Sequence, residues 1–110
     1  MPQSEQTSEL EDTIALFHKG SDSLTQFFAE QGRSDNDMLI AFDEIDKFLS
    51  TAKEGVSDSE QSARFNARAN ELILLVDRLM FFASKIQHQE SFVYFEEFLF
   101  SFTLWFARSG

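Results

Sequence analysis

The residues best suited to chemistry in this chain are its two histidines, His18 and His88. In helical bundles that hold two metal ions, a ligand histidine follows a glutamate by three residues, so that both side chains lie on one helix face. The residues three positions before the histidines are Ala15 and Lys85. The spacing therefore predicts no metal site. Because the chain has no cysteine, a zinc–thiolate site is excluded as well.

The segment His18-Lys19-Gly20-Ser21 invites comparison with histidine phosphotransfer domains, which are also small acidic four-helix bundles. In that family a lysine and a glycine follow the phosphorylated histidine by three and four residues, on the next helical turn. Here Lys19 directly follows His18, and adjacent side chains on a helix point about 100° apart. The spacing argues against a phosphorelay, and we expect His18 to be a partly exposed helix residue beside Phe17.

Two groups of carboxylates also merit a functional interpretation. The acidic run 43–46 surrounds Ile45 and has the pattern of a solvated helix face. Glu96 and Glu97 lie within a Phe-rich segment, but adjacent side chains diverge on a helix and do not form a paired acid and base. We expect these two glutamates to mark the solvent side of their helix. The arginines predicted to pair with them are Arg64, Arg68 and Arg78.

Composition places the chain among small helical proteins. One proline and four glycines in 110 residues leave long stretches without a helix breaker. No run alternates β-branched and polar residues as a half-buried strand would. The sequence therefore predicts an all-α domain. It contains no glycine-rich phosphate loop, nucleophile elbow or basic surface with interleaved aromatic residues, so we expect neither an enzyme nor a bound cofactor.

The formal net charge of −10 is unevenly distributed along the chain. Residues 1–62 contain fourteen Asp and Glu against four Lys and Arg, whereas residues 63–110 contain five of each. An acidic coat of this kind opposes binding to nucleic acids and to anionic membrane surfaces. The lack of cysteine, together with a polar and acidic N-terminus, leads us to expect a cytoplasmic location.

Apolar residues separated by three and four positions predict four helices within residues 8–110, which we expect to form a single domain after a disordered lead-in of residues 1–7. The first helix is predicted to follow Thr7 or Ser8, with Ser8 and Glu11 spaced as in a capping box. The apolar spacing continues through Gly20, which favours one helix, bent at that glycine, over two short ones. Gly32 is predicted to end this helix.

Ser34 is the expected N-cap of the second helix and Gly55 its end. The third helix is predicted to be the longest, over about 57–88 with a capping box at its start, and the fourth begins near Ser91. No glycine or proline separates these last two helices. One continuous helix over 57–108, within an oligomer, is therefore the alternative, since its length of about 77 Å is too great for a compact monomer.

The four apolar stripes share a period of about 3.5 residues, which is typical of helices packed at about +20° to one another. Connections of a few residues place successive helices antiparallel. The sequence thus predicts an antiparallel up-down-up-down four-helix bundle. Its predicted core consists of Ile14, Phe17, Phe42, Ile45, Leu49, Leu72, Val76, Leu79, Phe82, Phe95, Leu99 and Phe102.

The last helix is the most informative segment. Residues 91–108 hold six of the fourteen phenylalanines, the only tryptophan and the only tyrosine. Their main apolar stripe covers nearly half of the helix circumference, and a narrower ridge lies opposite, between Glu96 and Glu97. Sixteen residues interrupted by two glutamates are too few to span a membrane, so we expect part of this helix to meet another protein chain. The candidate partner-binding residues are Val93, Tyr94, Phe98, Phe100, Leu104 and Trp105, with Trp105 as the expected anchor.

These features favour a non-enzymatic interaction module, that is, a small acidic adaptor or chaperone-like protein that associates with itself as a homodimer. The predicted third helix is longer than the fourth, which would leave Phe65 without a cover and supports the same hypothesis. The alternative is an acidic inhibitor, immunity-type or nucleic-acid-mimicking, that acts through carboxylates of the first two helices. An apolar interface would tolerate salt, whereas an acidic one would weaken as salt is added.

Crowded carboxylates should make the stability of the fold sensitive to salt. Repulsion within the acidic half destabilises the folded state at low ionic strength, and added salt screens that repulsion. We expect the melting temperature, followed by circular dichroism, to rise between about 20 and 200 mM salt. A melting temperature that falls over this range would mean that specific ion pairs outweigh the net repulsion.

Overall fold

The computed structural model of the protein describes the backbone of residues 2–55 and 59–109. Within these ranges every element is a helix and no strand occurs, which confirms the predicted all-α class. The four helices are α1 (Pro2–Glu30), α2 (Asn36–Glu54), α3 (Ser59–Lys85) and α4 (Gln89–Ser109).

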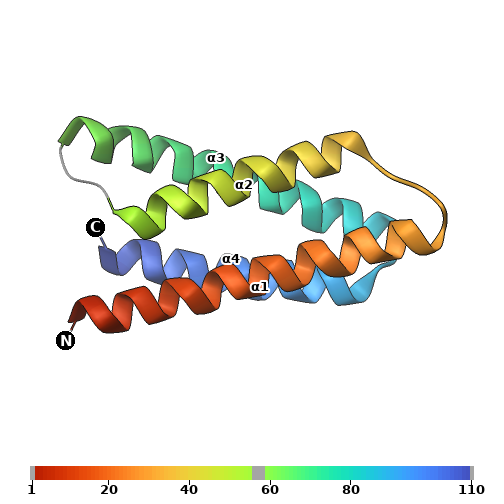
Figure 1. The fold of residues 1–110 in the computed structure, drawn as a ribbon, viewed down its shortest axis with the longest axis horizontal. Coiled ribbons are helices and arrows are strands. Elements are labelled where there is room, and N and C mark those ends of the chain that lie inside the picture. Colours follow the sequence, from red (N-terminus) through yellow and green to blue (C-terminus); the bar gives the residue numbers. More distant parts are fainter. Residues whose placement is uncertain (1, 56–58, 110) are drawn as a thin grey trace.

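The helices form a bundle in which each one runs back along the molecule in the direction opposite to the helix before it (Figure 1). In this view α1 and α2 lie in front, with α4 behind α1 and α3 behind α2. The bundle measures 45 × 26 × 18 Å. Its most extensive helix contact joins α1 to α4, the first and last elements of the chain.

The first helix begins earlier than the sequence predicted. α1 starts at Pro2, so residues 2–7 belong to the helix instead of forming a disordered lead-in. A proline suits the first position of a helix because its φ is already close to the helical value and its missing N–H would have had no intrahelical partner. Ser8 consequently lies inside α1, and the predicted capping box does not begin this helix.

The end of α1 confirms Gly32 as the terminating residue. Gly32 has a φ of 66°, and its N–H donates to the Ala29 carbonyl at 3.0 Å. The next N–H, from Arg33, donates to the Phe28 carbonyl at 2.9 Å. These two bonds form a Schellman motif, which favours glycine because the residue after the helix must adopt a left-handed conformation.

The N-cap of α2 is Asp35 and not the predicted Ser34. Asp35 Oδ1 accepts a hydrogen bond from the Met38 N–H at 3.0 Å. A carboxylate at this position also interacts favourably with the positive end of the helix dipole, an advantage that a serine hydroxyl lacks. Gly55 ends α2 as predicted, with a φ of 93°. The capping box predicted at Ser57 lies outside the described residues.

A tight turn separates α3 from α4, so the alternative of one continuous helix is not adopted in this structure. Gln87 has a φ of 60°, and its N–H donates to the Ser84 carbonyl at 3.1 Å. The N–H of His88 donates to the Ala83 carbonyl at 2.9 Å. This is the same Schellman pattern that follows α1, with glutamine in the position where glycine is usual.

The core combines phenylalanine rings from α1, α2 and α4 with smaller apolar side chains from α3, such as Leu72 and Val76. The ring of Phe17 lies at its centre, 5.5 Å from the Phe98 ring and 6.0 Å from the Phe42 ring, measured between centroids. The predicted core residues that prove to be buried are Phe17, Phe42, Ile45, Leu49, Leu72, Val76, Leu79, Phe95 and Phe102. The other three predicted members, Ile14, Phe82 and Leu99, lie at the margin and are only partly buried.

Gly20 sets how closely α1 and α4 approach each other. It is buried in the middle of α1, and a Cβ at this position would lie 2.8 Å from Cε1 of Phe95 and 3.2 Å from Cβ of Tyr94. Both distances are shorter than an ordinary van der Waals contact. α1 continues through Gly20 as a single helix. The missing side chain therefore makes room for α4.

In the substitution of Gly20 by alanine, helix propensity and packing have opposite effects on stability. Alanine is intrinsically the better helix former by about 1 kcal/mol, but its Cβ would clash with Phe95, which is fully buried. We expect Gly20→Ala to lower the free energy of unfolding by about 1–3 kcal/mol in denaturant titrations. The control Asn66→Ala, at an exposed position of α3, should be neutral or slightly stabilising. A gain in stability from Gly20→Ala would contradict the close approach of α1 and α4.

At Gln87, which has a left-handed backbone conformation, we expect a substitution by glycine to stabilise the fold. Because an L-residue with a side chain is strained at this φ, we expect Gln87→Gly to raise the free energy of unfolding by about 1 kcal/mol. Gln89→Gly, two residues further on in the first turn of α4, should instead lower it by a similar amount. Equal effects of the two substitutions in thermal melts would argue against the Schellman turn.

Candidate interaction surface

His18 lies at the surface between α1 and α2. Its Nε2 is 3.0 Å from Oδ1 of Asp46, and the two side chains are 53% and 50% exposed. The imidazole also lies beside the Phe17 ring, with 5.9 Å between centroids. The expectation of a partly exposed histidine next to Phe17 is confirmed. An exposed pair of this kind contributes at most about 1 kcal/mol to stability, so its clearest role is to join two helices at the surface.

His88 belongs to the turn that precedes α4. Its Nδ1 is 2.7 Å from Oγ of Ser91, and the Ser91 hydroxyl donates to the His88 carbonyl at 3.2 Å. The imidazole packs against Phe27 of α1 at 4.4 Å between ring centroids. His88 thus ties the α3–α4 turn to α1. Over the described part of the chain, no group of three or more acidic or histidine side chains is arranged to hold a metal ion.

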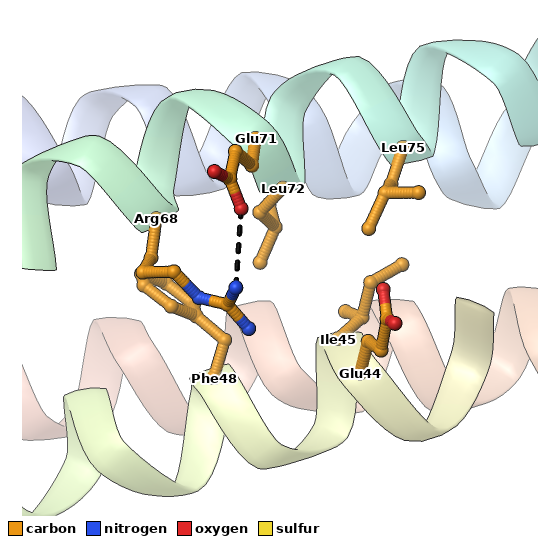
Figure 2. A pocket seen from close by; sticks show the side chains of 7 residues that line it. All are labelled: Glu44, Ile45, Phe48, Arg68, Glu71, Leu72 and Leu75. Carbon is orange, nitrogen blue, oxygen red and sulfur yellow. Dashed lines mark hydrogen bonds and ion pairs between the residues drawn. The ribbon is translucent and has the colours of Figure 1, made fainter. Parts of the chain in front are cut away.

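A shallow hollow between α2 and α3 is lined by apolar residues, with charged residues at its rim (Figure 2). Its volume is about 20 Å³, which is room for about one water molecule. Arg68 and Glu71 pair across one side of it, with 3.2 Å between Nη1 and Oε2. Glu44, from the acidic run 43–46, lies on the opposite side, on α2. The hollow is too small for an organic substrate.

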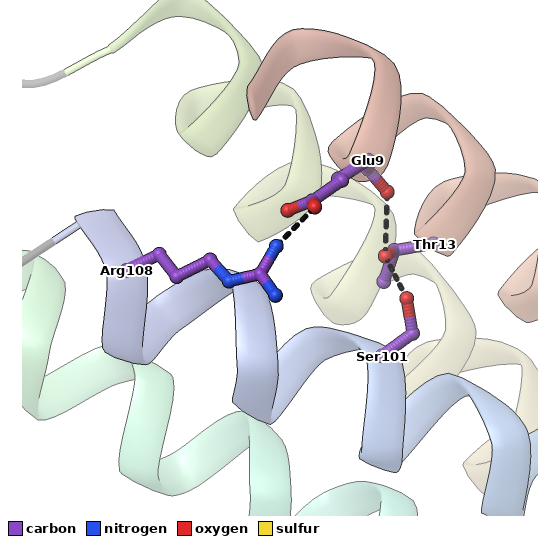
Figure 3. A network of polar contacts seen from close by, with 4 residues as sticks. All are labelled: Glu9, Thr13, Ser101 and Arg108. Atoms are coloured by element: carbon purple, nitrogen blue, oxygen red, sulfur yellow. Dashed lines mark hydrogen bonds and ion pairs between the residues drawn. The ribbon is translucent and has the colours of Figure 1, made fainter. Parts of the chain in front are cut away.

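A polar network connects the first half of α1 to the last turns of α4 (Figure 3). The Thr13 hydroxyl donates to the Glu9 carbonyl at 2.8 Å and shares a second hydrogen bond with the hydroxyl of Ser101. The guanidinium of Arg108 pairs with the carboxylate of Glu9. Thr13 is fully buried, so the hydroxyls of Thr13 and Ser101 satisfy each other inside the α1–α4 contact. Neither hydroxyl is hydrogen-bonded to a group that could activate it as a nucleophile.

Glu96 and Glu97 are exposed, as predicted, but the predicted ion pairs do not form. Arg64 and Arg68 pair within α3 instead, with glutamates four and three residues away. Arg78 is exposed and takes part in no ion pair among the described residues. The local pairs prevail because neighbours on one helix surface meet without bridging the distance between two helices.

The narrower apolar ridge of the last helix faces water. Val93, Phe100 and Leu104 are 37%, 71% and 44% exposed, and we call these three residues the α4 ridge. They occupy the side of α4 opposite to its buried phenylalanines. This exposure agrees with the position of the ridge between two glutamates that were expected to mark the solvent side of the helix.

The other candidate partner-binding residues are buried or half-buried. Phe98 is fully buried against Phe17, and Trp105 is 7% exposed and packs against Phe65, 6.2 Å away between ring centroids. The close α1–α4 packing turns their side of α4 inward, so a contact of Phe98 and Trp105 with a partner stays a prediction. Tyr94 is half-buried at the margin of that contact. Phe65, expected to lack a cover, is covered by α4.

Sequence reasoning missed a second exposed apolar surface, on α3. Leu74 and Phe81 are each 63% exposed, and we call this pair the α3 strip. At 100° per residue they lie roughly 160° and 140° around the helix from buried Val76, a signal that would have identified them. The ammonium group of Lys85 lies over the Phe81 ring, 5.1 Å from its centroid.

Comparison with known proteins adds no assignment, since no family model, no curated protein and no solved structure matches this chain. None of the helices in the described ranges is both long enough and apolar enough to cross a bilayer.

Proposed function

We propose that this protein is a non-enzymatic interaction module, a small acidic adaptor or chaperone-like protein of the cytoplasm that associates with itself through α4. The exposure of Phe100, 71% of its surface, is the single observation that carries the proposal. Phe100 lies seven residues after Val93 and four before Leu104, so the three side chains form one continuous ridge on the helix.

The bundle does not need this ridge for its own stability. Fully buried phenylalanines already fill the inner side of α4, and they contact α1 and α2. Burying one large apolar side chain contributes about 1.5–3 kcal/mol, and the exposed ridge forgoes most of that contribution within the monomer. Contiguous apolar patches on soluble proteins usually mark binding sites. A partner chain that covers the ridge would recover the lost hydrophobic free energy.

A second candidate function is supported by the negative charge of the layer formed by α1 and α2. Residues 1–62, which include α1 and α2, hold fourteen of the nineteen carboxylates. Asp37, Asp43 and Glu44 are exposed on α2. A surface of this kind suits an acidic inhibitor, immunity-type or nucleic-acid-mimicking, directed against a basic target. Such binding would weaken steeply as salt is added, whereas association through the α4 ridge would not.

Replacing an apolar side chain of the α4 ridge by a charged one tests the leading proposal. We expect the wild-type protein to sediment as a dimer or larger species at micromolar concentration, and Phe100→Glu to shift it towards monomer by about tenfold or more in dissociation constant. The matched control is Ile40→Glu, which removes an apolar side chain that is 57% exposed on α2. This control should leave the association unchanged.

Retained helicity in circular dichroism would show that Phe100→Glu acts on association and not on folding. A wild-type protein that sediments as a monomer at these concentrations and binds no hydrophobic dye would contradict the proposal. The acidic inhibitor would then become the better explanation of the surface.

A further inference from the structure

The two exposed apolar surfaces have the same spacing, and two bases lie along one side of the first whereas acids lie beside the second. In the α3 strip, Leu74 and Phe81 are seven residues apart with Asp77 and Arg78 between them, and Arg78 lies on the same side of the strip as Lys85. In the α4 ridge, the first two members are also seven residues apart, and Glu97 lies between them. Seven residues correspond to about two helical turns, so each pair lines one side of its helix, as side chains do where two helices interlock.

The charged residues beside these surfaces have no opposite charge to pair with inside the monomer. Arg78, Glu96 and Glu97 are all exposed, and none of them forms an ion pair with another described residue. Lys85 is exposed as well and contacts only the Phe81 ring among the interactions described for it. α3 thus offers apolar side chains with Arg78 and Lys85 along one side and the exposed Asp77 on the other, whereas acids flank both sides of the ridge on α4.

From this complementarity we infer that the α4 ridge packs against the α3 strip of a second copy of the chain. In a two-fold symmetric dimer each contact occurs twice, because residue i of one copy meets residue j of the other and the reverse. The bases of one α3 would then lie beside the acids of the partner's α4, at both ends of the interface. This arrangement rests on the proposed self-association through α4. It adds that the partner is a second copy of the chain and that α4 meets the α3 of that copy.

The distribution of charge favours a second copy over a different partner. Two molecules with a net charge of −10 repel each other, yet residues 63–110, which supply nearly all of α3 and α4, contain equal numbers of acids and bases. A dimer formed through this layer keeps the two acidic layers on its outside. The layer is also large enough, since a bundle of 45 × 26 Å in these two dimensions can supply the roughly 800 Å² per partner of a typical stable interface.

Reciprocal charge reversal tests this arrangement. One variant carries Arg78→Glu and Lys85→Glu, and the other carries Glu96→Arg and Glu97→Arg. Each variant alone places like charges opposite each other in a homodimer, so we expect its dissociation constant to be about tenfold weaker or more in sedimentation equilibrium. An equimolar mixture restores opposite charges at every contact. We therefore expect a heterodimer of wild-type affinity, which native mass spectrometry identifies from the summed mass of the two variants.

The control variant, Lys47→Glu with Lys53→Glu, changes the net charge as the α3 variant does, but on α2, and should dimerise as the wild type does. If both interface variants dimerise as tightly as the wild type, or if their mixture does not associate, the α3–α4 arrangement is wrong. A loss of dimer in Phe100→Glu would in that case still support association through α4. A wild-type monomer would overturn both the arrangement and the proposed function.

Discussion

The fit of Phe95 against Gly20 determines how the rest of the bundle is packed. Because α1 has no side chain at this point, α4 approaches it closely enough for the Phe95 ring to lie where a Cβ would otherwise be. This contact sets the rotation of α4 about its own axis, so Phe98 and Phe102 also point inward. Residues on the opposite side of α4 then have no position inside the monomer. The exposure of Phe100 is thus a consequence of the same contact that buries Phe95.

The side of the bundle away from Gly20 is held together differently. There the helices are separated by aromatic rings, such as the stack of Phe48 on Phe65 at 4.8 Å between centroids and the stack of Phe65 on Phe106 at 6.0 Å. Rings of this size fill the space between helices without close backbone contact. The protein therefore combines two kinds of helix contact. The backbones of α1 and α4 approach closely, whereas aromatic rings fill the space between the other helices. The high phenylalanine content suits the second kind of contact.

The sequence was informative wherever a single physical signal acted alone. The 3.5-residue period predicted four helices and most of the core, and the two adjacent glutamates predicted the solvent side of the last helix. Prediction was wrong where two adjacent residues could both cap a helix, and where the rotation of a helix about its axis decides which side chains are buried. Ser34 and Asp35 are adjacent candidates for one cap, and only the helix start distinguishes them. Trp105 was expected to anchor a partner, and its burial within the monomer was missed because the contact at Gly20 cannot be read from one helix. The turn at Gln87 was missed because it lacks the glycine that usually marks such a turn.

The division of the chain into an acidic layer and a charge-balanced layer gives the molecule a permanent electric dipole. Most of the negative charge lies in residues 1–62, and α1 and α2, which lie in front of α3 and α4 in Figure 1, belong to that part of the chain. The dipole moment therefore has a component across the thin dimension of the bundle, 18 Å. Near a positively charged surface the molecule would turn its α1–α2 side towards that surface. Its α3–α4 side would then face the solution, so adsorption through charge would leave the apolar residues accessible.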